Sequence, residues 1–206
     1  MKVVAIVQAR MGSERLPGKV LADVVGAPIL QRVIERVSSV ASINALVVAT
    51  TTESEDDLLD RWCTDRSIQV FRGSKNDVLE RFCICAELYD ADIIVRITAD
   101  DPLKDPELIS KAIELIISDP KIDYVSNTLR PSYPEGLDVE VFRLAQRTKK
   151  AVRKFDSAIQ STAEKLQEMI TDEDQYKDLI KKLQDIEKEI ANLTNFHQVN
   201  FIDTKA

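Results

Sequence analysis

The feature that most constrains the fold is the alternation, over the first two thirds of the chain, of short apolar runs with segments of helical character. The runs are rich in β-branched residues, and several are apolar at every position, as in strands that are buried on both faces. The runs span residues 3–7, 45–50, 69–71, 93–97, 124–126 and 137–142, and the helical segments span residues 29–40, 55–66, 77–89 and 106–117. This alternation predicts the α/β class, with a mostly parallel sheet that carries helices on both faces.

Residues that start helices support this division. Ser54, Asp77 and Asp105 stand where a side-chain oxygen can accept a hydrogen bond from the first turn of a helix. Pro106 stands at a first helical position, where a missing N–H costs nothing. Ligands of open parallel sheets bind at the carboxyl ends of the strands. We therefore expect the functional site in the loops that follow the apolar runs.

The composition changes near residue 142. All five glycines and all seven prolines occur at or before Gly136, and residues 143–195 are dense in charged and amide side chains. Apolar residues recur there at steps of three and four, as in an amphipathic helix; those of the second predicted helix are Tyr176, Leu179, Leu183, Ile186, Ile190 and Leu193. We expect an α/β domain over residues 1–142. Over residues 143–206 we expect an appended helical hairpin that packs on the domain or on a partner chain, as in a homodimer.

Charge and composition exclude several classes of protein. The formal net charge of -7 opposes binding to a nucleic-acid backbone, which depends on an excess of Lys and Arg. No apolar run approaches the ~18 residues of a membrane-spanning helix, and the N-terminal run is too short for a secretory leader. We therefore expect a cytoplasmic protein without nucleic-acid or membrane partners. Cys63, Cys83, Cys85 and the single His197 lack the spacing of a zinc site, so reduced thiols are expected.

The segment QARMGSERLPGKV, residues 8–20, has the composition of a phosphate-binding loop. It is not a P-loop, because five residues instead of four separate its glycines and a valine replaces the hydroxyl residue after the lysine. It also lacks the GxGxxG pattern of dinucleotide-binding folds. Side chains can take over the task, because Arg10 and Arg15 can grip phosphate oxygens and Lys19 adds a compact positive charge. The alternative is a basic surface turn without a ligand.

The same residues carry a resemblance to a known family. The loop, with VVATTTESEDD, VFRGSKNDVLERF, VRITADDPLKDPELI, DYVSNT and YPEGLDVEVF, resembles the cytidylyltransferases that make CMP-Kdo and CMP-sialic acid. It most resembles the branch named after spore coat polysaccharide biosynthesis protein F, over residues 1–142. The resemblance implies a Rossmann-like, nucleotide-diphospho-sugar transferase fold. It also implies an enzyme of polysaccharide biosynthesis that transfers CMP from CTP to an acidic sugar and releases pyrophosphate.

The resemblance also suggests which residues meet the nucleotide. Lys19, Arg10 and Arg15 are the expected catalytic residues, because they would stabilise the charge that grows on the departing pyrophosphate. Residues 72–81 are expected near the base and ribose, although Asp77 also suits a plain helix cap. The full set of expected nucleotide-binding residues is Ala9, Arg10, Gly12, Ser13, Arg15, Lys19, Arg72, Ser74 and Asp77.

Carboxylates near two strand ends are candidates for metal and sugar contacts. Asp100 follows a buried run directly and matches the family's metal-binding aspartate, so we expect it to hold Mg²⁺ together with substrate phosphates. Its neighbour Asp101 would point the opposite way, and contact with the sugar is expected of it instead. Asp138 and Glu140 alternate with apolar residues and so share one side of a strand. Asp138 could complete the metal site and Glu140 could orient a sugar hydroxyl, or both could lie on a solvated strand face.

After Phe142 the chain departs from the family's pattern, and only Asp203 stands in a context faintly like the family's late aspartate. This departure leaves open a nucleotide-binding relative that is catalytically impaired and uses its C-terminal helices for assembly. A glycosyltransferase is less favoured, because residues 99–101 read ADD and not DxD.

Overall fold

The computed structural model describes residues 1–13, 16–129, 133–144 and 201–203. The chain divides into one unit made of Met1–Leu144 with Val199–Ala206 and a second unit, Ala145–Gln198. The predicted helical hairpin falls in the second unit and lies outside the described residues, as does Arg15.

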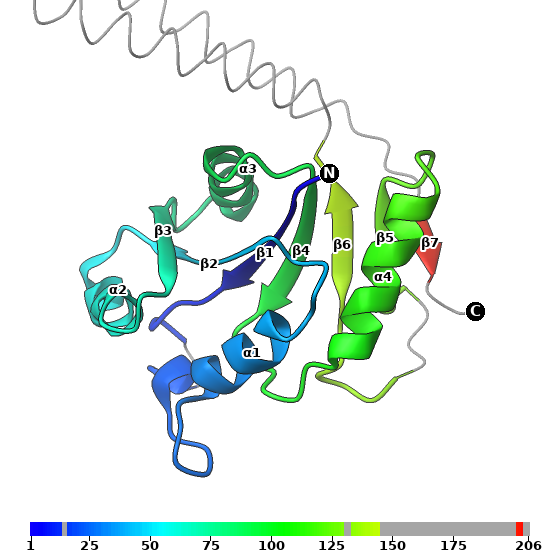
Figure 1. Ribbon diagram of the computed structural model, residues 1–206. Helices are drawn as coiled ribbons and strands as arrows, with labels where there is room; N and C mark the ends of the chain where they lie inside the picture. Colours follow the sequence, from blue (N-terminus) through cyan, green and yellow to red (C-terminus); the bar gives the residue numbers. More distant parts are fainter. Residues whose placement is uncertain (14–15, 130–132, 145–200, 204–206) are drawn as a thin grey trace, which may run out of the picture. The chain divides into compact units, whose positions relative to one another are not determined.

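A seven-stranded sheet forms the centre of the described domain (Figure 1). Its strands are β1 (Val3–Gln8), β2 (Ala45–Thr51), β3 (Gln69–Gly73), β4 (Ile93–Thr98), β5 (Tyr124–Ser126), β6 (Glu140–Arg143) and β7 (Phe201–Asp203), in the order β3-β2-β1-β4-β6-β5-β7. Strands β1 to β4 pair in parallel, whereas β6 is antiparallel to both β4 and β5. The predicted mostly parallel sheet is confirmed, with β6 as the reversed strand among those described.

The sequence did not predict β7. This short strand pairs in parallel with β5 and places Asp203 in register with Ser126. Residue 203 therefore belongs to the same sheet as the N-terminal strands, although the described chain between them is interrupted.

In the part of the chain that the structure describes, four α-helices cover the sheet on both faces, as predicted. They are α1 (Ile29–Ser38), α2 (Asp57–Thr64), α3 (Val78–Leu88) and α4 (Pro106–Ser118), and Figure 1 shows α1 and α4 in front of the sheet. Alternate residues of β1 pack on opposite faces: Val3, Ala5 and Val7 join the core under α1, α2 and α4, while Val4 and Ile6 join the core under α3. Burial on both faces explains why the β1 run is apolar at every position.

Two of the three predicted helix caps are confirmed. The carboxylates of Asp77 and Asp105 accept hydrogen bonds from the backbone N–H of Glu80 and Glu107, each at 2.8 Å. The prediction for Ser54 is wrong, because Ser54 begins a single 3-10 turn, Ser54–Asp56, and α2 starts only at Asp57. The physical reason lies in Asp56, whose side chain is buried and bonded to groups outside this helix.

The three cysteines are unpaired in the structure. Cys63 and Cys85 are buried, and burial raises the pKa of both thiols to about 12.

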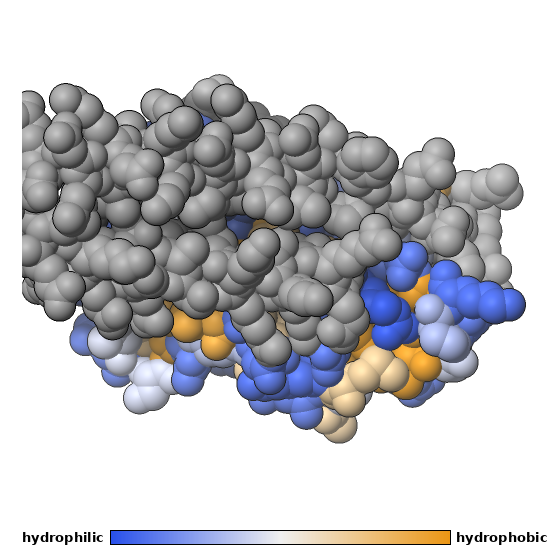
Figure 2. Space-filling model, turned by 90° about the horizontal axis from the view of Figure 1, so that it is seen from above, coloured by the Kyte–Doolittle hydropathy of each residue, from blue (hydrophilic) through white to orange (hydrophobic). Residues whose placement is uncertain are grey.

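Surface hydrophobicity is mixed. Viewed from above, the coloured surface in Figure 2 shows hydrophilic and hydrophobic residues side by side. Exposed apolar side chains include Leu79, Ile84 and Leu88 of α3. Among the described helices, none has the length and apolar character needed to cross a bilayer.

Candidate functional site

Those predicted site residues that the structure describes lie at the carboxyl edge of the parallel strands. The loops that follow β1, β2 and β4 leave the sheet at this edge (Figure 1), and the antiparallel β6 begins there, where Glu140 pairs with Arg96 of β4. Strand direction alone therefore brings residues 9–13, 16–28, 99–105 and 136–140 to one side of the domain.

The loop after β1 is fixed by a hydrogen bond to a buried carboxylate. Asp56 is fully buried, and its Oδ1 accepts a hydrogen bond of 2.6 Å from the backbone N–H of Met11. Its Oδ2 accepts hydrogen bonds from the N–H and the hydroxyl of Thr51 at the end of β2. The Met11 carbonyl in turn accepts hydrogen bonds from Ser13 and Gly18, both at 2.9 Å. The loop is thus tied at its start, while its cations stay unused by these contacts.

Asp56 is a residue that our sequence reasoning did not single out. The only signal was its place in the acidic run ESEDD after a buried strand, which reads equally well as the exposed first turn of a helix. Gly18, by contrast, was recognised in the loop, and its φ of 72° explains the glycine, because this left-handed conformation is costly for other residues.

Lys19 and Asp100 meet across the carboxyl edge. The Lys19 Nζ lies 2.5 Å from Asp100 Oδ2, and both side chains remain partly exposed, at 27% and 39%. Burial acts to raise the pKa of Asp100, but the hydrogen bond and positive charge of Lys19 outweigh it, so this pKa lies below its ordinary value. The predicted phosphate-binding lysine and the predicted metal-binding aspartate, 81 residues apart in the chain, are therefore direct neighbours.

The other loop residues differ in exposure and in whether their polar groups already have hydrogen-bond partners. Arg10 is exposed, whereas the Ala9 N–H is used by the sheet, in a hydrogen bond of 3.2 Å to Ala49. The Ser13 hydroxyl accepts a 3.4 Å hydrogen bond from the Leu16 N–H within the loop. A Cβ added at Gly12 would lie 2.4 Å from Oε1 of Glu55, the end of an exposed side chain that can move aside.

The residues expected near the base and ribose already have structural partners. Arg72 donates to the carbonyls of Thr51 and Glu53, both at 2.9 Å, and forms ion pairs with the α2 residues Asp57 and Asp60 at 2.7 and 3.3 Å. The Ser74 hydroxyl accepts from the N–H of Asp77 at 3.0 Å, and Asp77 caps α3. These contacts give Arg72, Ser74 and Asp77 a role in joining β3 to α2 and α3.

Buried polar atoms without partners lie close to this edge. They are Gln8 Oε1 on β1, Thr50 Oγ1 on β2 and Arg81 Nε on α3, each without a hydrogen bond among the described residues. Arg81 is only 2% exposed, and burial together with the charge of Arg10 lowers its pKa. A buried guanidinium with an unused donor is costly unless a ligand or water completes it.

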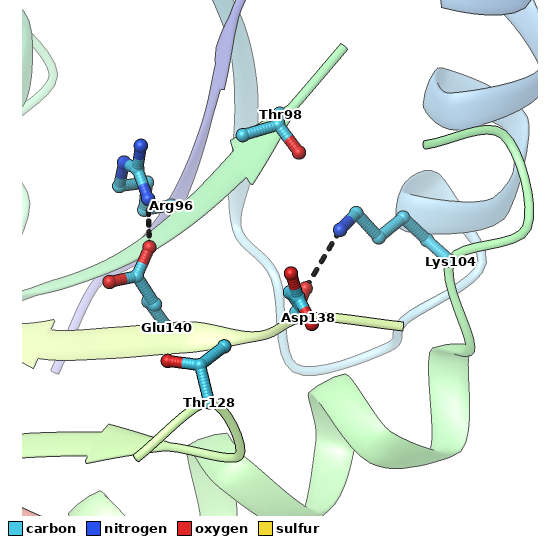
Figure 3. Close-up of a pocket in the computed structure, with 6 residues that line it drawn as sticks. All are labelled: Arg96, Thr98, Lys104, Thr128, Asp138 and Glu140. Carbon is cyan, nitrogen blue, oxygen red and sulfur yellow. Dashed lines mark hydrogen bonds and ion pairs between the residues drawn. The ribbon is translucent and has the colours of Figure 1, made fainter. Parts of the chain in front are cut away.

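Asp101 and Asp138 lie around a buried lysine, as Figure 3 shows in part. The Lys104 Nζ donates to Asp101 Oδ2 at 2.9 Å and to the Asp138 carbonyl at 2.8 Å, and Lys104 is only 1% exposed. Asp101 also accepts from the Thr98 hydroxyl at 2.7 Å. Asp100 and Asp101 therefore contact different partners, as predicted, although residues 99 and 100 form a turn and not the extended segment that the prediction assumed.

Asp138 and Glu140 line one pocket of about 230 Å³ with Arg96, Thr98, Lys104 and Thr128 (Figure 3). Glu140 forms an ion pair with Arg96 and accepts a hydrogen bond of 2.6 Å from the hydroxyl of Tyr124. Burial and the bond to Glu140 raise the pKa of Tyr124 to about 12. Asp138 and Glu140 thus share one side of the strand, as the alternation predicted.

One candidate ligand for a divalent cation, Asp100, lies at this edge of the sheet. No group of three His, Cys, Asp or Glu side chains arranged for a metal occurs among the residues that the structure describes. The partly exposed carboxylate of Asp100 fits Mg²⁺ nevertheless, because magnesium is usually held by one or two carboxylates plus substrate phosphates.

Comparisons with known proteins agree with this architecture. The chain is 41% identical over 142 residues to an uncharacterized protein of Methanocaldococcus jannaschii, covering 69% of this chain and 57% of that protein. It is 40% identical to the spore coat polysaccharide biosynthesis protein SpsF of Bacillus subtilis, over 54% of this chain and 48% of the relative. A 3-deoxy-manno-octulosonate cytidylyltransferase of Geobacter metallireducens is 33% identical over 59% of this chain and 47% of its own length. The chain thus spans about half the length of these curated relatives.

Solved structures show the same fold. A cytidylyltransferase from Leptospira borgpetersenii is 35% identical, with a TM-score of 0.67 over 76% of this chain and 64% of that chain. A CMP:2-keto-3-deoxy-manno-octonic acid synthetase complexed with CTP has a TM-score of 0.57 at 20% identity, over 82% of this chain and 84% of its own. Residues 4–135 match the sequence profile of the cytidylyltransferase family, and the chain therefore belongs to that family.

Proposed function

We propose that this protein activates a sugar by transferring CMP from CTP to a sugar hydroxyl, with release of pyrophosphate. The observation that carries the proposal is the meeting of Lys19 with Asp100 beside the loop of residues 8–20. The proposal is supported because the candidate phosphate-binding cation and the candidate metal-binding carboxylate lie together at the edge where open parallel sheets bind their ligands. Membership of the cytidylyltransferase family supports CTP as the donor.

In the proposed reaction the sugar hydroxyl oxygen attacks the α-phosphorus of CTP. The bond between the α-phosphorus and its bridging oxygen breaks, pyrophosphate leaves with the bonding electrons, and the hydroxyl proton passes to water. Lys19, Arg10 and Arg15 stabilise the negative charge on the departing group, so catalysis is mainly positioning and electrostatics. Mg²⁺, if held by Asp100, would neutralise the phosphates, and Asp138 is the weaker candidate for a second ligand.

We further infer that the acceptor is an acidic sugar used in surface polysaccharide biosynthesis. Support comes from relatives whose names give 3-deoxy-manno-octulosonate as the sugar and spore coat polysaccharide as the product pathway. A cytoplasmic location and a homodimer stay predictions of the sequence. No observation favours the alternative of an impaired relative, and the experiment below separates it from the enzyme.

The test is pyrophosphate release by the full chain with CTP, Mg²⁺ and a panel of acidic sugars. Lys19→Ala should lower kcat at least ~10²-fold, the scale of losing one charge-stabilising group, with the fold unchanged by circular dichroism. Lys121→Ala, at an exposed lysine before β5, is the matched control and should keep full turnover. CTP binding without pyrophosphate release from any sugar would favour the impaired relative, and activity that survives Lys19→Ala would refute the role of the loop.

A further inference from the structure

Lys104 is a buried cation that has no part in the proposed reaction. Its side chain is 1% exposed, and it is the one buried lysine among the residues that the structure describes. Its Nζ donates to Asp101 Oδ2 at 2.9 Å and to the Asp138 carbonyl at 2.8 Å, and Figure 3 shows the second of these bonds. A buried ion pair is weak evidence for stability, because well-packed apolar residues often serve a fold equally well. The contacts of Lys104 therefore point to a role other than stability.

Residue 104 joins three parts of the domain. Its carbonyl accepts a hydrogen bond from Nε of Arg36 on α1, and its side chain reaches the segment before β6 at Asp138. Its other partner, Asp101, accepts a 2.7 Å hydrogen bond from the hydroxyl of Thr98, the last residue of β4. The loop between β4 and α4 is thus tied to α1, to the end of β4 and to the segment before β6.

Asp100 stands between two fixed points of this loop. On one side, the N–H of Ala99 donates to the carbonyl of Gln8 at the end of β1, at 3.1 Å. On the other side, Asp101 is held by Lys104. The side chain of Asp100 nevertheless stays 39% exposed. Its backbone is therefore fixed while its carboxylate remains open to a ligand.

Lys104 also gives the two adjacent carboxylates different roles. It neutralises Asp101, whose Oδ2 accepts from Lys104 and from Thr98, so this oxygen is not offered to a cation at the edge of the sheet. Asp100 is not held in this way and can be offered. Groups that orient a metal ligand without touching the metal commonly matter for binding, and their loss lowers metal affinity about 10- to 100-fold.

Direct contact between Lys104 and a phosphate fits these observations less well. Two of the three N–H donors of its ammonium group are already in use, and the side chain is almost fully buried. An incoming phosphate would have to break the bond to Asp101 and leave a partly buried carboxylate without its partner, which is costly. Lys104 is therefore placed to act through the loop and not on the ligand.

We propose that Lys104 is a positioning residue, which holds the loop after β4 through Asp101 so that Asp100 is oriented for Mg²⁺ bound to the nucleotide phosphates. The bond to the Asp138 carbonyl supplies the fixed end of this anchor. The inference rests on the proposed function, because it takes Asp100 as the metal ligand.

The test variant combines Asp101→Asn with Lys104→Met, which removes the anchor and leaves the net charge unchanged. Calorimetry measures the affinity for CTP with and without Mn²⁺. The gain in affinity that Mn²⁺ brings should shrink about tenfold or more. The affinity without metal and the urea midpoint should stay close to those of wild type, because a buried ion pair is replaced by neutral groups of similar size.

Two single variants frame this measurement. Lys111→Met, at an exposed lysine of α4, is the matched control and should keep the full gain. Asp100→Asn should lose the gain, because it removes the ligand itself. An unchanged gain in the double variant would overturn the proposal, and so would equal losses of CTP affinity with and without Mn²⁺, since the anchor would then shape the site as a whole.

These outcomes do not depend on turnover. If wild type binds CTP no better with Mn²⁺, Asp100 holds no metal and the role of Lys104 falls with it, even where pyrophosphate is released. If wild type shows the gain but releases no pyrophosphate with any sugar, the proposed function fails and the variants still decide the role of Lys104.

Thr98→Val serves if the double variant does not fold. It keeps the shape of the side chain and removes one of the two hydrogen bonds that hold Asp101. The gain from Mn²⁺ should then fall about two- to tenfold, the effect of one hydrogen bond. A gain equal to that of wild type would show that the hold on Asp101 does not orient Asp100, and it would overturn the proposal.

Discussion

The replacement of Asp56 by Asn tests most directly how the loop after β1 is positioned. Asp56 Oδ1 accepts from the Met11 N–H and Oδ2 accepts from the N–H and hydroxyl of Thr51, all in a fully buried position. Asn has nearly the same shape but only one acceptor oxygen. Its NH₂ group must therefore face either the Met11 N–H or the two donors of Thr51. The variant should therefore lose either the loop tether or the strand contacts, without creating a cavity.

The size of this effect follows from the bonds that are lost. Hydrogen bonds to a charged acceptor contribute about 1.5–3 kcal/mol each, and one or two of the three are lost. The free energy of unfolding should therefore fall by roughly 2–4 kcal/mol. This is less than the 5–15 kcal/mol of a typical domain, so the variant should still fold. With a urea slope of about 2 kcal/mol per M, the unfolding midpoint should fall by about 1–2 M.

The assay uses the only tryptophan of the chain, Trp62 of α2, whose fluorescence reports on this domain. Asp65→Asn, at an exposed carboxylate after α2, is the control and should stay within about 0.5 kcal/mol of wild type. CTP affinity should also fall in Asp56→Asn, because the loop loses its anchor at Met11. Unchanged stability would refute the hydrogen-bond argument, and lost stability with full CTP affinity would show that Asp56 supports the fold but not the loop.

Two further predictions concern titration and reactivity. Because Lys19 holds the pKa of Asp100 below its ordinary 3.8, the carboxylate's contribution to stability is complete above about that pH and is lost as pH falls through the lower folded value. Urea unfolding of wild type and Asp100→Asn should therefore differ by a constant amount near neutral pH and converge in acid; a difference independent of pH would contradict the ion pair. Burial raises the pKa of Cys63 and Cys85 to about 12. Ellman's reagent should therefore label both thiols slowly in the native protein and fast in urea. Rapid labelling of either thiol in the native protein would show that these thiols are accessible.

Patterns that depend on neighbours in the chain were readable from the sequence. The apolar runs, the caps at Asp77 and Asp105 and the loop of residues 8–20 are local features, and the strands and helices follow them closely. The reversed direction of β6 was not readable, because strand pairing depends on contacts between distant segments. The strand β7 was missed because three residues are too few to show a periodic pattern.

Among the site residues, the missed ones are polar groups whose burial the sequence does not reveal. Lys104 stands in PLKDP, where a lysine reads as solvent-exposed, yet its side chain is 1% exposed because it spans from the loop after β4 to the segment before β6. Asp56 was overlooked because an acidic residue near the start of a helix is normally explained as part of an exposed first turn. In both cases the fold supplies partners that lie tens of residues away.

These two buried residues perform the same task for two halves of the site. Asp56 fixes the loop that carries Lys19 through backbone contacts, and Lys104 links Asp101, next to Asp100, to the segment that carries Asp138. The side chains that would face ligands are thus left partly exposed, as Lys19, Asp100 and Asp138 are. Preorganisation of this kind favours charge stabilisation in the transition state, because the donors need not be reoriented when the reaction occurs. Substitution of Asp56 or Lys104 should therefore change the affinity for the ligand by more than the distance between that residue and the ligand would suggest.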